Sequence, residues 1–331
     1  MRNILLSIVL LPFYCFSQPS KAINSTIDKW KRASVGLEMR KFASDYIELQ
    51  PQLKNIQEDL QIAKQSIGTA VFLKHNSKRY LISARHVLHD IDGANQLKKY
   101  SNQDSVDIEN AIFQNIFRIA QEDEINEKDS IEAVRSGLPL LGVMSYSQRR
   151  YVFSSVELDL AIISLDGGCI YSMFADFLES KGYVPITLND IDTSDLQYGQ
   201  DIISIGFPLI GFEAVKKESD IGRQAFQSGL IWERAITFGK ISIPKSKHYF
   251  CVGDISTAPG NSGGPLISKN KLVAIVSKQA VFPIENNQGN QIKDLNSRMP
   301  YAIAVRAAYI YPLLMEMIKK DEENKGPSWC R

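Results

Sequence analysis

Cysteine and histidine are both scarce in this sequence, with four residues of each among 331. If the first residues are removed as a leader, three cysteines remain: Cys169, Cys251 and Cys330. Three cysteines allow at most one intrachain disulfide, and three small packed side chains are the open alternative. No Cys or His pair has the spacing of zinc ligands, so we expect no metal and no cofactor.

An excess of charge of one sign is also missing. Lys and Arg number 38, and Asp and Glu number 37. Surfaces that bind nucleic acid or anionic membranes are generally rich in Lys and Arg. We therefore expect no nucleic acid partner and no polybasic membrane patch, so that partners must be inferred from a specific site.

The long apolar run is confined to residues 4–16, which follow a positive charge at Arg2. A spanning helix needs about 20 apolar residues, whereas about a dozen suit a secretory signal peptide. We expect residues 1–17 to be a signal peptide and the mature protein to be secreted or periplasmic, without stable membrane insertion. A buried N-terminal helix, a membrane anchor and lipidation at Cys15 are the weaker alternatives.

The rest of the chain contains many short apolar segments separated by polar turns. Such a pattern favours β-barrels or β-sandwiches. The predicted strands cover residues 68–74, 80–83, 158–165, 201–206, 236–243, 249–252, 272–276 and 301–305.

Two stretches have helical spacing instead. Ile108, Ile112 and Ile116 recur every four residues, which predicts an amphipathic helix. This helix lies in residues 95–150, which we interpret as an insertion, either a lid or partner surface or a packed decoration. A second helix is expected over residues 306–323, where it would close the domain.

The strongest local pattern is Gly260-Asn261-Ser262-Gly263-Gly264-Pro265-Leu266. A serine that attacks a carbonyl needs two backbone N–H groups directed at the developing oxyanion. Glycines let the backbone approach the substrate without a Cβ in the way. We therefore expect Ser262 to be a nucleophile, with the N–H groups of Gly260 and Ser262 as the oxyanion hole.

A serine is a weak nucleophile without a base and a group that orients the base. His86 follows a predicted strand, and imidazole can take and return a proton near neutral pH. Asp159 lies in an apolar segment, where a carboxylate is costly unless it is hydrogen-bonded. Each residue alone has an ordinary structural explanation, but the order His86, Asp159, Ser262 in these contexts predicts a catalytic triad.

These motifs resemble the trypsin-like, chymotrypsin-fold serine peptidase superfamily, and within it the bacterial high-temperature-requirement (Htr or Deg) proteases. The resemblance covers Ser66 to Leu314, apart from residues 95–150. It implies an all-β fold of two orthogonal six-stranded antiparallel β-barrels, with a helical insertion in the first barrel and a C-terminal helix. The matching segments are residues 68–72, 81–87, 159–162, 206–208 and 260–266.

The resemblance also implies a domain arrangement. Residues 18–65 would be an extension leading into the first barrel, which would span 66–175 and contain the insertion. The second barrel and C-terminal helix would span 176–325. The triad would lie in the cleft between the barrels.

Substrate-binding residues are likewise implied by the resemblance. Ser277 would lie beside the buried carboxylate, and the strand edge Ser277, Lys278, Gln279 would pair with the backbone of a polypeptide substrate. Ser256, six residues before the nucleophile, occupies the place where an acidic residue would select Lys or Arg. A small or medium apolar side chain is therefore the expected preference.

Two further departures from the family pattern affect regulation. Asn261 stands where pancreatic relatives have an aspartate that pairs with a newly cut N-terminus, so we expect no activation of that kind. Only 17 residues follow Leu314, too few for the PDZ domain of Htr proteases.

The leading hypothesis is a serine endopeptidase. The alternatives are a catalytically silent protein of the same fold that binds peptides or acts as a scaffold, and a hydrolase that acts on esters.

Overall fold

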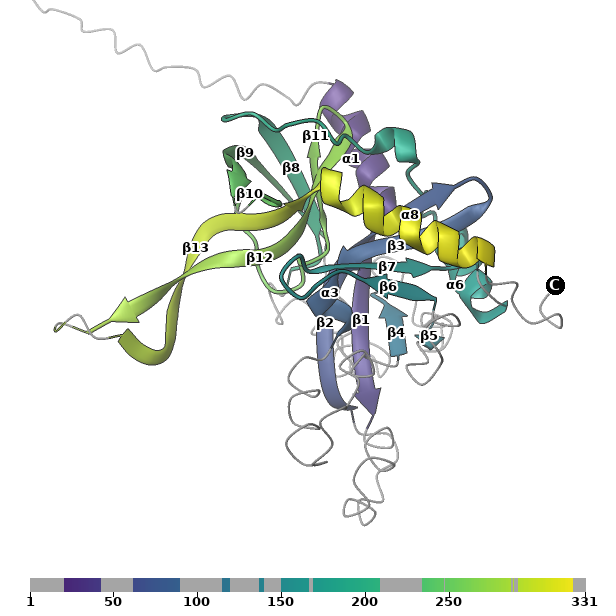
Figure 1. Cartoon of the computed structure of the whole chain (residues 1–331), viewed down its shortest axis with the longest axis horizontal. Helices are drawn as coiled ribbons and strands as arrows, with labels where there is room; N and C mark the ends of the chain where they lie inside the picture. The colour runs from purple at the N-terminus through teal and green to yellow at the C-terminus, as the bar shows by residue number, and fades with distance from the viewer. Residues whose placement is uncertain are drawn as a thin grey trace, which may run out of the picture.

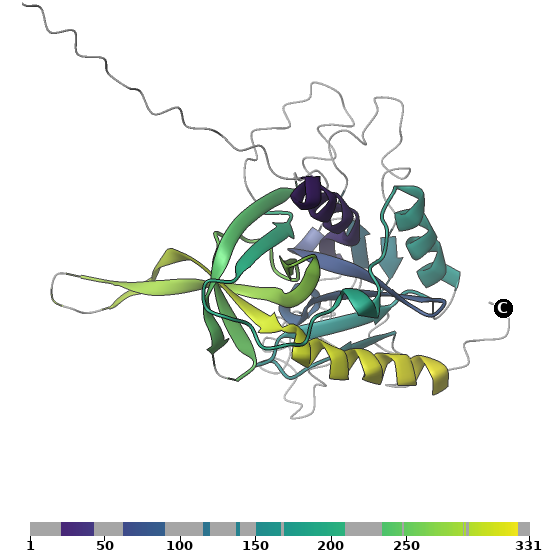
Figure 2. The same cartoon turned by 90° about the horizontal axis from the view of Figure 1, so that it is seen from above.

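The structure of the chain is a computed structural model. Two β units lie side by side, and the helices α1 (Lys21–Ala33), α6 (Cys169–Ser180) and α8 (Ala307–Glu323) pack around them (Figures 1 and 2). None of the described helices is both long and apolar enough to cross a membrane. The described residues are 21–42, 62–89, 115–119, 137–139, 150–166, 169–208, 234–246, 248–286, 288 and 291–323.

The first unit is an antiparallel sheet of seven strands in the order β5-β4-β1-β2-β3-β7-β6. Strands β2 and β3 form a tight hairpin through Asn76, whose φ of 54° suits asparagine at a turn. A short helix α3 (Arg85–Leu88) follows β3 directly. The strands are β1 (Ser34–Phe42), β2 (Ile62–His75), β3 (Lys78–Ala84), β4 (Asn115–Arg118), β5 (Gly137–Pro139), β6 (Tyr151–Phe153) and β7 (Leu160–Ser164).

The second unit is a closed antiparallel barrel in the order β10-β13-β12-β11-β8-β9. Small and β-branched side chains fill it, among them Ile202, Ile241, Val273 and Ala304. A 3-10 turn, η4 (Leu188–Asp190), precedes the barrel. The strands are β8 (Asp201–Gly206), β9 (Ala235–Ser246), β10 (Phe250–Asp254), β11 (Pro265–Ser268), β12 (Lys271–Glu285) and β13 (Gln291–Arg306).

One hydrophobic cluster joins the two units. It includes Tyr80 and Ile162 from the sheet and Ile275 from the barrel, and Ile310 and Met317 of α8 cover it. Helix α8 contacts β6 and β7 of the sheet as well as β12 and β13 of the barrel. Burial of about 25 cal/mol per Å² of apolar surface favours this shared core, so the two units hold a fixed mutual position.

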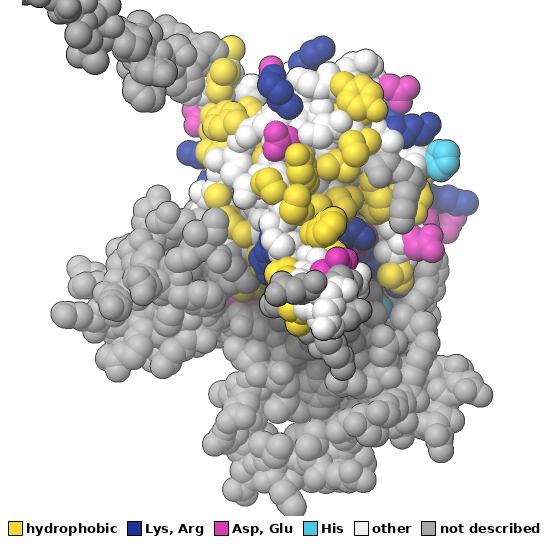
Figure 3. Space-filling model, turned by 90° about the vertical axis from the view of Figure 1, so that its left-hand side faces the viewer, with side chains coloured by type: hydrophobic (Ala, Val, Ile, Leu, Met, Phe, Trp, Pro, Cys, Tyr) yellow, Lys and Arg dark blue, Asp and Glu magenta, His cyan; other side chains and the backbone are white. Residues whose placement is uncertain are grey.

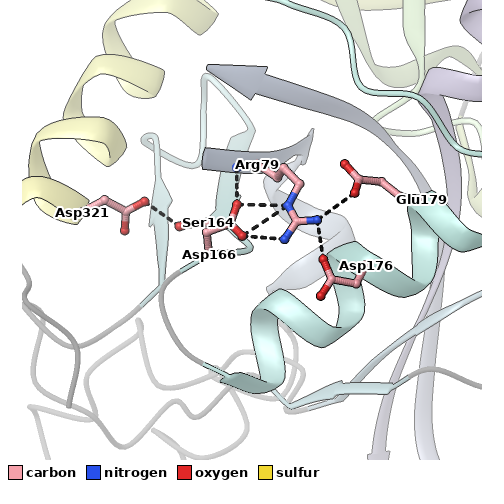
Figure 4. A network of polar contacts seen from close by, with 6 residues as sticks. All are labelled: Arg79, Ser164, Asp166, Asp176, Glu179 and Asp321. Atoms are coloured by element: carbon pink, nitrogen blue, oxygen red, sulfur yellow. Dashed lines mark hydrogen bonds and ion pairs between the residues drawn. The ribbon is translucent and has the colours of Figure 1, made fainter. Parts of the chain in front are cut away.

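A polar network fixes α6 to the sheet (Figure 4). The Arg79 guanidinium of β3 bonds Asp166 at 2.7 Å, and Asp176 and Glu179 of α6 at 2.6 and 3.0 Å. The hydrogen bond to Asp166 raises the pKa of Arg79 although burial opposes this. On the far side of the sheet, the Ser164 hydroxyl donates to Asp321 of α8 at 2.5 Å. Both helices are thus tied to the sheet by polar as well as apolar contacts.

The predicted fold class is confirmed: the protein is mostly β, and the closed six-stranded barrel beside a second sheet is consistent with a chymotrypsin-like double barrel. The described strands of the first unit number seven rather than six. Strand β1 comes from the segment 18–65, which the sequence suggested as an extension. The C-terminal helix expected over 306–323 is observed as α8, whereas α1 and α6 were not predicted.

The predicted helix around Ile116 is wrong where the structure describes it. Asn115–Arg118 is strand β4, paired antiparallel with β1 so that Ile116 lies opposite Met39. Both side chains are fully buried. A short apolar run fits either periodicity, and here partnering with β1 decides the outcome. Because β4 and β5 belong to the sheet, part of residues 95–150 is scaffold; Ile108 and Ile112 lie outside the described residues.

Candidate active site

His86 and Asp159 lie together at the point where β3 ends and its neighbour β7 begins. His86 is in α3, directly after β3, and its Nδ1 lies 2.8 Å from Asp159 Oδ2. The backbone N–H of His86 also donates to Asp159 Oδ1 at 2.9 Å. The imidazole is 41% exposed, whereas the carboxylate is 13% exposed. The carboxylate therefore holds the imidazole through Nδ1, and the ring remains partly exposed.

Asp159 has an uncommon backbone conformation. Its φ is 57°, in the left-handed region that aspartate tolerates better than most residues. Its N–H donates to the Ser155 carbonyl at 3.0 Å, and its carbonyl accepts from Arg85 N–H at 3.1 Å. These bonds hold the turn that directs the carboxylate at His86.

Ser277 of β12 contacts both of the other functional groups. Its buried hydroxyl donates to Asp159 Oδ2 at 2.5 Å. Its carbonyl accepts a hydrogen bond from Ser262 Oγ at 3.0 Å. The structure thus brings Ser262 and Asp159, which come from different β units, to one residue of the barrel.

The Ser262 hydroxyl is therefore not donating to His86 in this structure. A hydroxyl has a single proton to donate, and here the Ser277 carbonyl accepts it. The hydroxyl proton must turn from the Ser277 carbonyl to the imidazole before it can be transferred.

The loop around Ser262 has the conformation that its glycines allow. Gly260 and Gly263 have φ of 98° and 84°. A Cβ on Gly263 would overlap the Thr69 carbonyl oxygen, and one on Gly260 would overlap the Phe207 carbonyl oxygen. Both positions thus require glycine for space as well as for φ.

Backbone hydrogen bonds in this loop leave two donors. The N–H groups of Asn261, Gly263 and Gly264 donate to the carbonyls of residues 258, 276 and 261. Among the described residues, the N–H groups of Gly260 and Ser262 donate to no other group. These are the two donors that the sequence suggested for an oxyanion hole.

Thr69, which the sequence analysis did not single out, contacts the loop around Ser262. Its buried hydroxyl donates to the Gly260 carbonyl at 2.7 Å and accepts from Phe207 N–H at 3.2 Å. Its N–H donates to the Ser262 carbonyl at 2.7 Å. Strand β2 therefore holds the loop of the second unit through one residue. In the sequence, Thr69 is only a hydroxyl directly before the apolar run of 70–73, which does not by itself indicate a contact with a distant loop.

The residues suggested for substrate binding differ in exposure. Ser256 lies exposed on the loop after β10, and Lys278 is exposed with its amine 5.8 Å from the Phe250 ring. Gln279 is half-buried, and its amide donates to the Met299 carbonyl at 3.0 Å. Ser277 is 1% exposed. Of these four residues, Ser277 alone bonds a predicted triad member.

Cys251 is a free, fully buried thiol inside the barrel. Burial raises its pKa to about 12. Of the two readings for the cysteines, a disulfide through Cys251 is therefore wrong. The Cys169 side chain and Cys330 lie outside the described residues. Within the described segments, no three His, Cys, Asp or Glu side chains lie close enough to hold a metal ion.

Comparison with protein families agrees with this arrangement. The chain matches the trypsin-like peptidase domain over residues 68–275. The match covers more than half of the chain and includes β2, α3, β7 and the loop of Ser262. The chain therefore belongs to the trypsin-like peptidase family, and a protease activity of the serine type follows at this coarse level. Comparison with curated proteins found no match.

Proposed function

We propose that this chain is a serine endopeptidase in which His86, Asp159 and Ser262 form the catalytic triad. The observation that carries the proposal is the meeting of three sequence-distant groups: His86 bonds Asp159, Asp159 bonds Ser277, and Ser277 bonds Ser262. The family supplies the general chemistry, acyl transfer to water.

In the first step, Ser262 Oγ leaves the Ser277 carbonyl and gives its proton to Nε2 of His86 as it attacks a peptide carbonyl. Asp159 accepts from Nδ1, which fixes the tautomer and stabilises the imidazolium. The N–H groups of Gly260 and Ser262 receive the oxyanion. A single donor of this kind typically accounts for about 10² to 10³ in rate.

In the second step, His86 gives the proton to the leaving amine, which departs as the acyl-enzyme forms. His86 then takes a proton from a water molecule that attacks the ester carbonyl. As the bond from the acyl carbon to Ser262 Oγ breaks, His86 returns that proton to Ser262 Oγ and the acid product is released. The accessible face of the imidazole suits this exchange with bulk water.

The substrate is proposed to be an extended polypeptide that pairs with β12 at Ser277, Lys278 and Gln279. Ser256 carries no charge, so it supports a small or medium apolar side chain before the cleaved bond rather than Lys or Arg. We also propose export through a signal peptide at residues 1–17 to a secreted or periplasmic location. Those residues lie outside the described ones.

A catalytically silent peptide-binding or scaffolding protein is the second candidate. The hydrogen bond from Ser262 to the Ser277 carbonyl favours it, because the nucleophile is directed away from its base. The candidates differ in what happens when peptide binds: the endopeptidase turns the hydroxyl toward His86, and the silent protein does not.

Cleavage of a proteome-derived peptide library, read by mass spectrometry, tests the proposal. We expect cleavage by the wild type and a fall on the order of 10⁶-fold for Ser262→Ala. Binding of library peptides without cleavage would support the silent protein. Turnover of an ester but of no peptide would support an ester hydrolase.

A further inference from the structure

Strands β12 and β13 continue beyond the barrel as a two-stranded ribbon, which projects to the left in Figures 1 and 2. The pairing of β11 with β12 ends at Ile275, and that of β10 with β13 is confined to Tyr301–Val305. The two strands remain paired with each other out to Glu285 and Gln291. Among the described strands, none pairs with the outer edge of either strand of the ribbon.

The free edge of β12 begins inside the candidate active site. The first residue beyond the β11 pairing and the Val276 hydrogen bonds is Ser277, which bonds Ser262 and Asp159. The edge then runs outward through Phe282, and at Pro283 the backbone lacks an N–H to donate. Six residues, about 20 Å if fully extended, therefore lead outward from the nucleophile. Their pairing with β13 shifts register between Val276 and Lys278 and between Gln279 and Val281.

The ribbon also carries exposed apolar side chains. Val281 is 56% exposed, Phe282 61% and, on the other strand, Ile292 42%. In Figure 3 the molecule is seen from the side on which the ribbon projects, and hydrophobic side chains are visible on this side. An unpaired strand edge with apolar side chains is a ready template for an added strand.

We propose that the substrate strand expected along Ser277–Gln279 continues along the ribbon to Phe282, where the exposed Val281 and Phe282 select apolar residues well before the cleaved bond. This inference rests on the proposed endopeptidase function and extends its substrate class. Every ladder between the described strands is antiparallel. An added antiparallel strand enters at the outer end of the ribbon and reaches Ser262 with its carboxyl end.

This polarity fixes which substrate residues the ribbon contacts. If Ser277 lies opposite the residue before the cleaved bond, Val281 and Phe282 lie near the fifth and sixth residues before it. The register shifts of β12 between Val276 and Lys278 and between Gln279 and Val281 can move this count by a residue. Directly opposed side chains in an antiparallel pair lie about 4.5–5.5 Å apart. Apolar or aromatic residues at those two positions would cover the exposed side chains of the ribbon.

The test compares peptides that share one cleavable sequence and differ upstream. One ends three residues before the cleaved bond, one continues for eight with Val and Phe at the fifth and sixth positions, and one has Gly and Ser there. We expect the apolar long peptide to exceed both others about tenfold in kcat/KM. Equal values for all three would overturn the inference.

Matched variants locate the effect on the edge of β12. Val281→Ser and Phe282→Ser should each remove most of the advantage of the apolar long peptide and leave the short peptide unchanged. Ile292→Ser, which removes an exposed apolar side chain from the other strand, should change neither. A loss in Ile292→Ser as large as in Phe282→Ser would contradict selection by β12.

Binding measurements separate this inference from the proposed function. If no peptide is cleaved, the endopeptidase proposal fails, and fluorescence anisotropy with the apolar long peptide and the Ser262→Ala variant still reports on the ribbon. If the Ser262→Ala protein binds the apolar long peptide more tightly than the double variant Ser262→Ala, Phe282→Ser, the role of the β12 edge is supported. Equal affinities of the two proteins would refute it. If the wild type is a dimer that Val281→Ser dissociates, and if peptide length has no effect on cleavage, the edge would instead bind a second copy of the chain.

Discussion

The Ser277 hydroxyl donates to the Asp159 carboxylate at 2.5 Å. Ser277 belongs to the barrel and Asp159 to the sheet, so this bond crosses between the two β units at the candidate active site. The Ser277 carbonyl meanwhile accepts from Ser262. One buried residue therefore sets the position of the carboxylate and of the resting nucleophile.

Replacing Ser277 by alanine should lower kcat on a short peptide about 3- to 30-fold, because the carboxylate loses a donor that orients it toward His86. KM should change little, since the backbone edge remains. Steady-state kinetics check this, with thermal unfolding as the control for folding. An unchanged kcat would show that the bond has no positioning role.

Thr69→Val keeps the shape of the side chain but removes its two hydrogen bonds to Gly260 and Phe207. Both partners are then left unpaired in a buried site, which should cost about 1 to 3 kcal/mol of unfolding free energy. Activity should fall as well, since the oxyanion loop keeps the bond from Thr69 N–H to the Ser262 carbonyl but loses the one from the Thr69 hydroxyl to Gly260. Ser180→Ala removes an exposed hydroxyl bond to Phe177 and should change neither quantity.

Gly263→Ala should abolish activity and destabilise the fold, because φ is 84° and the added Cβ would overlap the Thr69 carbonyl. The matched control is Gly182→Ala, where φ is 83° and no atom lies within 4 Å of the added Cβ. That control isolates the conformational cost, on the order of 1 kcal/mol. Equal denaturation midpoints for the two variants would contradict the crowding argument.

Arg79→Gln should lower the free energy of unfolding by about 1 to 3 kcal/mol, since it leaves the mostly buried Asp166 carboxylate without its guanidinium partner. The pairs with Asp176 and Glu179 add little, because those two carboxylates are exposed. The active site is not touched, so kcat should hold at temperatures where the variant is folded. Lys240→Gln breaks an ion pair whose side chains are 63% and 86% exposed. We expect a change below about 0.5 kcal/mol there, by urea denaturation of both variants.

Local chemistry made much of the site predictable. The glycines around Ser262 reflect a steric need that any sequence with this loop must meet. His86 and Asp159 stand out because each follows or opens an apolar strand. The link between them is tertiary, but the order and context of the three residues were enough to expect it.

Other features depend on partners that are distant along the chain. The role of Thr69 exists only where β2 meets the loop of the barrel, and nothing in the residues near Thr69 encodes that meeting. Ile116 has helical spacing with Ile112, yet its strand conformation follows from pairing with β1. The sequence analysis missed the ribbon because it predicted that the strand ends at Val276. That position is one residue beyond the last residue of β12 that pairs with β11.

The most direct test of the triad is labelling of Ser262 by a fluorophosphonate, which reacts with a serine only when a base activates it. Peptide mapping by mass spectrometry should place one probe on Ser262 in the folded wild type, and His86→Ala should abolish that labelling while keeping its fold. Folded wild type without a probe on Ser262, or equal labelling of His86→Ala, would contradict the account.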